Sequence, residues 1–554
     1  MKFPIQIRLS MFLVVLSFSA TTMLYAQLNQ GGIPRSFVFS ISPEKETLIL
    51  PSPDLEKLRA EDELAPIPYR YAVNLPTDID PDRSGVWMTA MDGSLVWRVA
   101  IKATGALALT LYFDRFRLPD GGKLFIYNPN RTQLLGAFTA LNNNSGNRFA
   151  TELIHGDELT LEYNAPAGLK EKPVIHLSEV AYAYRGVRGA ARVPGDFGQA
   201  GLCEVNINCS EGNYWQAHKR GVVRISVKRS GSSFWCTGSL INNARYDRKQ
   251  YILTADHCGV YTTENDWNQW IFYFGFESLL CPNPIMEPAS NTMTGGKRIA
   301  HGGDGGNTGS DFFLMLLNEP VPDSYNVYYS GWSREDIPSP SGVGIHHPQG
   351  DIKKISTYTT PLQTSNWNGN PYLSHWKVTW NVTVNGHGVT ERGSSGSPIL
   401  DDNGRIVGTL TGGDSQCDTG HLNAPDYYGK FSWHWDQNGT DSASCLKFWL
   451  DPDNTGVMAL DGMLVSIGEN PAATPLKVFP NPFSTELTIE LPVTDRVCSI
   501  GLFDLFGNKL FSRDYTGDSP RLIKLDLQSV SSGLYLVKVA SAKETRIVKV
   551  LKLF

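Results

Sequence analysis

Six of the eight cysteines lie between residues 203 and 417, and this cluster constrains the fold more than any other feature of the sequence. The six are Cys203, Cys209, Cys236, Cys258, Cys281 and Cys417. In an exported protein such a cluster is typical of a disulfide framework. Six cysteines allow fifteen pairings, and the spacing alone does not choose among them. Cys445 and Cys498 are left over and stay unassigned.

The first 26 residues predict export. Lys2 and Arg8 precede the short apolar run MFLVVLSF, and small residues follow near Ala20 and Ala26. A charged segment, a short apolar core and small residues are together typical of a secretory signal peptide, here residues 1–26. No later stretch reaches the roughly 20 apolar residues that a membrane-spanning helix needs. We therefore expect a protein that is exported and can form disulfides.

The remaining sequence divides into mainly β regions, because 554 residues exceed what one core can hold. Residues 27–198 alternate apolar and polar runs such as SLVWRVAIKA. Residues 199–467 are rich in Cys, Trp and Gly, with short β-like runs and one helix-like segment, SASCLKFWLDP (442–452). A linker at 468–475 leads to residues 476–554, which contain runs such as LTIEL and LYLVKV. These patterns predict a barrel or sandwich in the centre and a small β-sandwich at the end.

The stretch TERGSSGSPIL (390–400) is a candidate nucleophile turn. A cluster of Gly, Ser and Pro is usually a surface turn, but glycines can also present one serine on a sharp bend. A serine hydroxyl is a weak nucleophile and needs a general base with a third group that orients this base. The rest of the chain therefore decides between the two interpretations.

A base and an orienting acid precede this turn in the sequence. His257 follows a β-like run in YILTADHCG, and a bridge between Cys258 and Cys236 would fix its backbone. Asp311 begins the apolar run in GSDFFLMLL, where a carboxylate can be buried while it accepts a proton from the imidazole. Asp304 in HGGDGGNTG is a rival, although that stretch is more typical of a flexible loop or a weak Ca²⁺ site.

TADHC, DFFLMLL and GSSGSP resemble, in this order, the signature segments of chymotrypsin-fold serine peptidases. The resemblance implies a chymotrypsin-like double β-barrel with His257, Asp311 and Ser395 as catalytic residues. It selects Ser395 as the nucleophile and the backbone amides of Gly393 and Ser395 as the oxyanion hole. Residues 199–467 would then be the protease domain.

Several longer segments resemble the bacterial lysyl endopeptidases. They include CTGSLINN, DRKQYILTADHCG, IHHPQGDIKKIS, GVTERGSSGSPI and FWLDPDNTG. The resemblance implies a secreted endopeptidase that cleaves protein and peptide substrates after lysine. It also implies the disulfides Cys203–Cys417, Cys209–Cys281 and Cys236–Cys258.

A pocket for a basic side chain needs a carboxylate at its base, because an unpaired buried cation is very costly. Trypsin-like enzymes place an aspartate six residues before the nucleophile, where this chain has Val389. The resemblance to lysyl endopeptidases instead implies Asp426 in APDYYGKF as the substrate-binding acid. It matches Trp367 to a tryptophan near the active-site histidine that stacks with a histidine in an LHGG segment. This chain has Thr411 there, so we expect the stacked pair to be absent.

The tail resembles the C-terminal sorting domain of the type IX secretion system of Gram-negative bacteria. VFPNPF, LFDLFGNKL and SGLYLVKV carry this resemblance. It implies the type IX machinery as a partner and a secreted or cell-surface location for the protein. An ordinary adhesion module is the alternative interpretation of these strands.

Other classes of function find little support. A net charge of −6 without a Lys/Arg stripe disfavours a nucleic-acid partner. His346 and His347 are adjacent, but no HExxH motif or zinc-type spacing accompanies them, so we expect them to be structural. We expect no cofactor, no metal and a monomer.

Residues 27–198 are expected to be a β-rich propeptide that assists folding and delays activity, given their position before an Arg-rich junction. The junction contains Arg185, Arg188 and Arg192 but no lysine between Lys172 and Lys219. Either a separate Arg-cleaving protease processes the chain, which we favour, or the pocket accepts both Lys and Arg. A second class of function is a catalytically inactive surface adhesin on a protease scaffold.

Overall fold

The computed structural model describes most of the chain and divides it into two compact units, Met1–Ile467 and Gly468–Phe554. The expected signal peptide (1–26), the linker (468–475) and junction residues 186–198 lie outside the described residues. No helix in the described part is long and apolar enough to cross a membrane. The described residues are 30–39, 46–64, 68–185, 199–284, 287–465, 477–491, 497–503, 509–515, 522–541 and 545–553.

The N-terminal region is mainly β, as its alternating runs predict. Most of SLVWRVAIKA forms β4, and ALTLYF begins β5; alternate side chains of both strands, such as Val99 and Leu111, are buried in one apolar core. One sheet has the order β1-β4-β10-β6-β7 with β3 beside β4, and β2, β11, β5, β8 and β9 form part of a second sheet. The elements are α1 (Arg35–Val38), β1 (Glu46–Ile49), α2 (Leu55–Leu64), β2 (Tyr69–Ile79), β3 (Val86–Thr89), β4 (Leu95–Lys102), β5 (Ala108–Arg117), β6 (Lys123–Tyr127), β7 (Leu134–Phe138), η1 (Ala140–Asn142), β8 (Phe149–Ala150), β9 (Ile154–His155), β10 (Glu158–Ala165) and β11 (Val174–Ala183).

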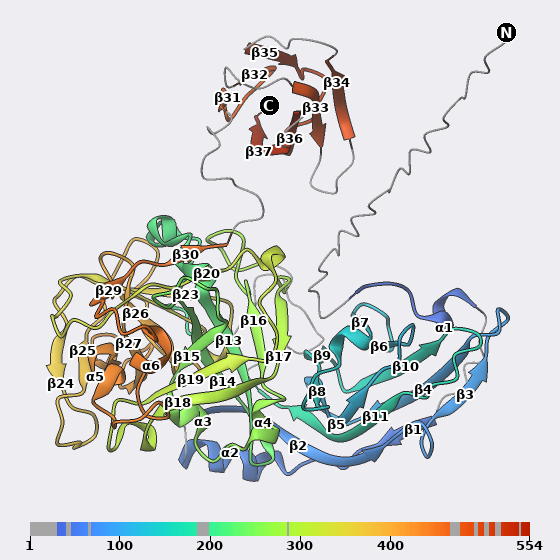
Figure 1. Cartoon of the computed structure of the whole chain (residues 1–554), viewed down its shortest axis with the longest axis horizontal. Helices are drawn as coiled ribbons and strands as arrows, with labels where there is room; N and C mark the ends of the chain where they lie inside the picture. Colours follow the sequence, from blue (N-terminus) through green and yellow to red (C-terminus); the bar gives the residue numbers. More distant parts are fainter. Residues whose placement is uncertain are drawn as a thin grey trace, which may run out of the picture. The chain divides into compact units, whose positions relative to one another are not determined.

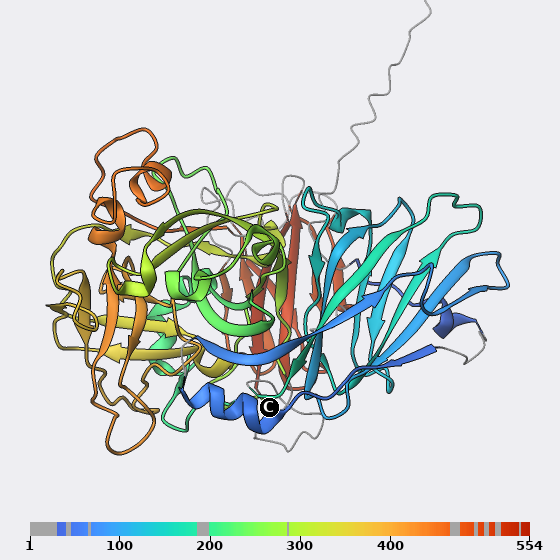
Figure 2. The same cartoon turned by 90° about the horizontal axis from the view of Figure 1, so that it is seen from below.

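The second sheet continues from the N-terminal region into the expected protease region through β2. This strand pairs with β11 on one side and with β14 (Ser232–Ile241) on the other, as its long course between the two lobes in Figures 1 and 2 shows. An apolar cluster covers the contact, and within it the Tyr71 ring stacks on Trp235 with centroids 4.1 Å apart. The two regions therefore share a sheet and a core, which the composition does not predict.

Seven strands form the first half of the expected protease region. They pair in the order β17-β16-β13-β14-β15-β19-β18. The apolar run VVRISV lies in β13, and YILT forms β15. The strands besides β14 are β13 (Val222–Arg229), β15 (Tyr251–Thr254), β16 (Ile271–Phe274), β17 (Asn291–Thr294), β18 (Gly296–Gly302) and β19 (Phe312–Leu317).

A ten-stranded sheet forms the second half of this region. Its main order is β12-β23-β22-β26-β27-β28-β25-β24, with β21 and β29 beside β27, and a separate pair joins β20 to β30. One apolar cluster contains residues of both halves, including Leu314 and Leu400. The strands are β12 (Val205–Asn206), β20 (Tyr328–Tyr329), β21 (Trp332–Ser333), β22 (Gly342–His346), β23 (Lys354–Tyr358), β24 (Gln363–Ser365), β25 (His375–Val378), β26 (Pro398–Asp401), β27 (Ile406–Gly413), β28 (Asp426–Lys430), β29 (Ala459–Leu460) and β30 (Met463–Leu464).

Helices in this region are short. The helix predicted at 442–452 is reduced to the single turn α6, because Asp441–Ser444 forms a turn in which the Ser444 hydroxyl donates to Asp441. The sequence reasoning missed α5, which follows β28 directly. The helices are η2 (Ser210–Trp215), η3 (His218–Gly221), α3 (Asp256–Gly259), α4 (Glu264–Trp267), η4 (Asp304–Gly306), η5 (Asp323–Tyr325), η6 (Pro348–Gly350), α5 (Phe431–Asp436) and α6 (Lys447–Leu450).

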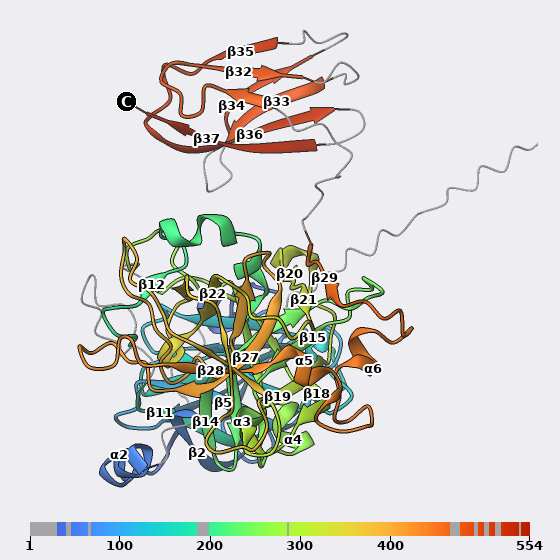
Figure 3. The same cartoon turned by 90° about the vertical axis from the view of Figure 1, so that its left-hand side faces the viewer.

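The C-terminal unit is a small β-sandwich, as its strand-like runs predict. A three-stranded sheet, β31-β32-β35, and a four-stranded sheet, β34-β33-β36-β37, share one apolar core, and Figure 3 shows them as two layers. The strands are β31 (Lys477–Phe479), β32 (Glu486–Glu490), β33 (Val497–Phe503), β34 (Lys509–Asp514), β35 (Leu522–Asp526), β36 (Gly533–Ser541) and β37 (Thr545–Lys552). The side chain of Cys498 lies outside the described ones.

Candidate active site

His257 and Asp311 lie beside two neighbouring strands of the first half and are joined by two hydrogen bonds. His257 lies in α3, directly after β15, and Asp311 immediately precedes β19, which pairs with β15. The His257 backbone N–H donates to Asp311 Oδ1 over 2.9 Å, and the distance from Nδ1 to Oδ2 is 2.7 Å. Asp311 is fully buried, and its backbone has a φ of 60°. The carboxylate therefore orients the imidazole ring.

The other ring nitrogen of His257 is left as a proton acceptor. With Nδ1–H donating to the carboxylate, Nε2 carries the lone pair. Nε2 has no hydrogen-bond partner among the described residues, and the His257 side chain is 13% exposed. Leaving a buried nitrogen without a hydrogen bond costs free energy. The geometry therefore favours a role in which Nε2 of His257 accepts a proton during a reaction.

The glycine-rich loop before Asp311 packs closely against this pair. A Cβ on Gly305 would lie 3.3 Å from the His257 Cβ, and one on Gly306 would lie 3.4 Å from the Asp311 Cβ. Both glycines have positive φ, so the loop depends on them. The rival acid Asp304 begins η4 in this loop, but its side chain lies outside the described ones.

The turn around Ser395 is held by two glycines that cannot be replaced without strain. Gly393 and Gly396 have φ of 96° and 80°. A Cβ on Gly393 would lie 2.8 Å from Gln349 N, and one on Gly396 would lie 2.0 Å from Thr254 Oγ1. The turn therefore packs tightly against β15 of the first half and against η6 of the second half, just before β26 begins.

Two amides of this turn are free donors. The N–H groups of Ser394 and Gly396 donate to Glu391 O and Leu410 O. No hydrogen bond within the described part of the chain uses the N–H of Gly393 or Ser395. The free amide of the serine itself and that of the glycine two residues before it can together stabilise the negative oxygen of a tetrahedral intermediate.

Ser395 lines a cavity of about 680 Å³ together with Trp367, Thr390 and Ser415. Its backbone lies beside the disulfide that follows His257, with Cys258 Sγ 4.0 Å from Ser395 O. No hydrogen bond joins the Ser395 hydroxyl to His257 Nε2 in the described structure. Such contacts are often long in the absence of substrate.

Asp426 is a buried carboxylate behind the wall of this cavity. It begins β28 and is 1% exposed. Its Oδ2 accepts hydrogen bonds of 2.6 Å each from Trp380 Nε1, Thr390 Oγ1 and Ser415 Oγ. Burial raises the pKa of Asp426, and these donors oppose the shift. Val389, at the position where trypsin-like enzymes have an aspartate, is buried in the apolar core.

Trp367 has a different histidine beside it, His375, in a tilted and not a stacked contact. The ring of His375, in β25, lies 6.3 Å from the Trp367 ring with the planes at 32°, a tilted contact. His375 Nε2 lies 3.1 Å from Thr411 Oγ1, and burial lowers the pKa of His375 to about 4. Sequence reasoning missed His375 because strand pairing, and no local motif, brings it to this position.

His346 and His347 are buried structural residues. His346 Nδ1 lies 2.9 Å from Ser394 Oγ, and its Nε2 lies 2.9 Å from Ser356 Oγ. His347 Nδ1 donates to Asp351 O. Burial lowers the pKa of His346 to about 3 and that of His347 well below its usual range. Both rings are therefore neutral at ordinary pH.

Three disulfides join Cys203 to Cys417, Cys209 to Cys281 and Cys236 to Cys258. These are the three pairs that the family resemblance implies. The third closes a loop from β14 to the residue after His257. Cys445 is a buried free thiol.

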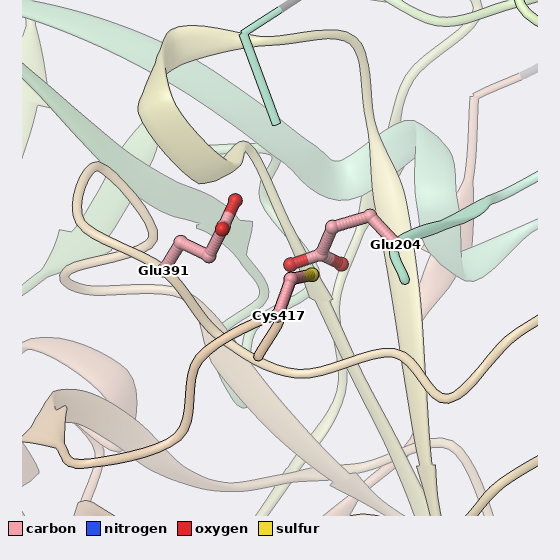
Figure 4. Close-up of side chains that lie close together, drawn as sticks. All are labelled: Glu204, Glu391 and Cys417. Carbon is pink, nitrogen blue, oxygen red and sulfur yellow. The ribbon is translucent and has the colours of Figure 1, made fainter. Parts of the chain in front are cut away.

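Glu204 and Glu391 lie beside Cys417, as Figure 4 shows. The sulfur of Cys417 belongs to a disulfide and offers no thiolate to a metal. Two carboxylates alone provide too few ligands for a dedicated Ca²⁺ or Zn²⁺ site. Burial raises the pKa of both Glu204 and Glu391, so protonation is the simpler way to accommodate them.

Family comparisons match two segments of the chain. Residues 197–429 match the family described as "Lysyl endopeptidase, C-terminal domain". Residues 477–552 match the "Secretion system C-terminal sorting domain". A lysyl endopeptidase of Pseudomonas aeruginosa is 28% identical over 366 residues, which cover 63% of this chain and 76% of that protein.

Three proteases are among the solved structures that match part of this chain. A thermostable serine protease, AL20, from an extremophilic microorganism has a TM-score of 0.28 and 14% identity, with 39% of this chain and 92% of that chain covered. The protease Anisep of Arthrobacter nicotinovorans has a TM-score of 0.28 and 18% identity, with 39% and 90% covered. A Glu endopeptidase has a TM-score of 0.26 and 17% identity, with 42% and 93% covered.

Proposed function

We propose that this chain, with a lysyl endopeptidase segment at 197–429 and a sorting segment at 477–552, is a secreted serine endopeptidase that cleaves after lysine. The observation that carries the proposal is the buried Asp426 carboxylate behind the wall of the cavity that Ser395 lines. A carboxylate at the base of a pocket recognises a basic side chain. The substrates are proteins and peptides.

The catalytic steps follow from the groups around Ser395. The Ser395 hydroxyl attacks the scissile carbonyl while His257 Nε2 takes its proton, and Asp311 stabilises the imidazolium that forms. The Gly393 and Ser395 amides donate to the oxyanion. His257 then protonates the leaving amine, and a water molecule, activated by the same nitrogen, hydrolyses the acyl-enzyme.

The contacts of Asp426 favour lysine over arginine. Its Oδ2 already accepts three hydrogen bonds, and its Oδ1 lies 3.3 Å from Ser415 N. A guanidinium binds best to a carboxylate whose two oxygens are both open, whereas an ammonium can interact as a point charge with a carboxylate and nearby hydroxyls. Thr390 and Ser415 supply such hydroxyls at the cavity wall.

The proposal includes residues 27–198 as a propeptide, and two contacts of the N-terminal region support it. Tyr69 and Arg185 line the same cavity as Ser395. Arg185 lies 3.0 Å from Asp62 and over the Tyr69 ring at 4.4 Å, so the N-terminal region itself holds it there. Residues 27–198 would thus cover the site until they are removed. Because the junction offers arginines and no lysine, a separate Arg-cleaving protease is the processing partner.

The sorting segment supports export by the type IX machinery. The protease would then act as a monomer outside the cell or on its surface. Sequencing the amino terminus of the secreted enzyme tests the processing step. A terminus that follows a lysine would contradict the Arg-cleaving partner.

Hydrolysis of matched peptides that differ only in Lys or Arg tests the specificity. The wild type should cleave the Lys peptide with the higher kcat/KM. Asp426→Asn should lower that value by roughly 10²- to 10³-fold, because it removes the partner of a buried charge. Asp418→Asn, a change to an exposed aspartate of the same segment, is the control. Equal cleavage of both peptides would overturn the Lys preference, and an unreactive Ser395 would favour the adhesin alternative.

A further inference from the structure

Two charged side chains that line the Ser395 cavity form no ion pair and no side-chain hydrogen bond with other described residues. Arg392 and Asp414 both line the cavity, and both are exposed. Their backbones make hydrogen bonds, from Gln349 N to Arg392 O and from Asp414 N to Pro425 O. Among the described residues, neither the Arg392 guanidinium nor the Asp414 carboxylate takes part in an ion pair or a side-chain hydrogen bond. They are available to a ligand.

The acid next to Arg392 in the sequence does not neutralise it. Glu391 Oε2 accepts hydrogen bonds from Gly201 N over 3.0 Å and from Gln349 Nε2 over 3.3 Å. Its carboxylate also lies close to Glu204 and Cys417 (Figure 4). Both side chains line the cavity, but the Glu391 carboxylate already accepts these two hydrogen bonds, whereas the Arg392 guanidinium has no such partner among the described residues.

The backbone that carries Arg392 is fixed beside the nucleophile. Gly393 has the left-handed conformation and packs against Gln349 N, and Ser394 N donates to Glu391 O. Arg392 precedes Ser395 by three residues, so their Cα atoms are at most about 11 Å apart. Its long side chain can therefore reach the residues of a peptide next to the scissile bond.

Asp414 belongs to a different wall of the cavity. It follows Gly412 and Gly413, which end β27 and line the same cavity. A peptide bound across Ser395 thus meets a positive group on one loop and a negative group on another. Opposite charges on two loops can select peptides by the charges of the residues next to the lysine, in addition to the lysine itself.

We propose that Arg392 and Asp414 determine specificity at the positions flanking the scissile bond. Arg392 selects acidic residues within three positions of the cleaved lysine, and Asp414 selects basic residues at another of these positions. This inference rests on the proposed function, because it needs a peptide bound at Ser395. Exposed ion pairs are weak and sensitive to salt, so each preference should be about two- to fivefold.

The test is a cleavage profile of a denatured-protein peptide library, read by mass spectrometry. The enzyme is recovered after expression of the full chain, as wild type, Arg392→Glu, Arg392→Ala and Asp414→Lys. We expect the wild type to favour Asp or Glu near the cleaved lysine. Arg392→Ala should remove this preference, and Arg392→Glu should replace it with one for Lys or Arg. Asp414→Lys should remove the preference for basic residues at the other position.

Lys249→Glu is the matched control, because it reverses an exposed charge outside the cavity lining. It should leave the flanking profile unchanged. A wild-type profile measured at low and at 0.5 M salt gives a test without any variant, and the preference should weaken at high salt, where the Debye length falls to about 4–5 Å. An unchanged flanking profile in Arg392→Glu, or a salt-independent preference, would overturn the proposal. Loss of cleavage after lysine in the wild type would instead overturn the proposed function.

Discussion

Two histidines, His257 and His346, lie near the Ser394–Ser395 pair, and the hydrogen-bond partners of their ring nitrogens differ. His257 has a carboxylate on Nδ1 and no partner on Nε2. His346 has hydroxyls on both nitrogens, those of Ser394 and Ser356, and is fully buried. The first ring can gain a proton, because Asp311 stabilises its charge. The second ring stays neutral, since burial lowers its pKa to about 3.

The comparison separates a histidine that only contacts a serine from one with the surroundings that a general base needs. His346 has a closer serine contact in this structure than His257 has. What distinguishes His257 is an oriented ring, a stabilising acid and a free nitrogen. Each of these features can be removed separately.

The largest expected effect is a loss of kcat on replacing Ser395, and Ser394 provides the matched comparison. Ser395→Ala should lower kcat by roughly 10⁶-fold, as the loss of a catalytic nucleophile does. Ser394→Ala removes a partner of the buried His346 and should mainly reduce stability, by about 1–3 kcal/mol. Peptide hydrolysis and denaturant unfolding measure the two effects. A larger loss of kcat in Ser394→Ala than in Ser395→Ala would reverse the assignment.

The orienting acid gives the next largest effect. Asp311→Asn should lower kcat by about 10⁴-fold, because an amide stabilises the wrong tautomer of His257 and cannot balance the imidazolium charge. Ser356→Ala makes the corresponding change beside His346 and should leave kcat within about tenfold of wild type. Steady-state kinetics on a Lys peptide compares the two. Similar kcat values for both variants would contradict the role of Asp311.

The disulfide beside His257 should contribute a moderate stabilisation. Cys236 and Cys258 are 22 residues apart, and in the chain-entropy model a loop of this length is worth about 3 kcal/mol. The double variant Cys236→Ser/Cys258→Ser should lower the free energy of unfolding by that amount. Urea denaturation on a Ser395→Ala background, which prevents self-digestion, measures it. An unchanged unfolding midpoint would argue against this bridge in the folded protein.

A further expected effect is a dependence of stability on pH that comes from His346. Its folded pKa of about 3 lies below the ordinary value of 6.5, so folding favours the neutral ring. Its contribution is complete above about pH 6.5 and is lost as the pH falls toward 3, by about 1.4 kcal/mol per pH unit at most. His346→Gln should therefore flatten the stability profile between pH 4 and 6. The exposed His421→Gln is the control, and an equal slope in both variants would count against this explanation.

Short motifs predicted the local parts of the site well. TADHC and DFFLMLL lead to His257 and Asp311, which are 54 residues apart and are in contact in the structure. Local sequence succeeds here because each residue lies at the end of a strand whose apolar pattern is clear. The mainly β architecture follows from the same patterns.

Features that depend on distant strands could not be predicted. Thr411 indicates that the stacked pair is absent, but it does not indicate that the β25–β28 and β27–β28 pairings bring His375 beside Trp367 in a tilted contact. The helix expected at 442–452 fails for a local reason, because turns formed by Asp441 and Ser444 compete with helical hydrogen bonds. A pattern of apolar residues does not report such competition.

The direct pairing of β2 with β14 has a consequence for the solubility of the N-terminal region and the protease region once they are separated. Without residues 27–198, the edge of β14 from Ser232 to Trp235 would lose its partner strand. Trp235, Tyr273 and Phe276 would lose part of the apolar cluster that now covers them. An open strand edge beside exposed aromatic rings promotes self-association. Light scattering of the separated protease region, with and without added N-terminal region, would measure whether the N-terminal region also acts to prevent aggregation.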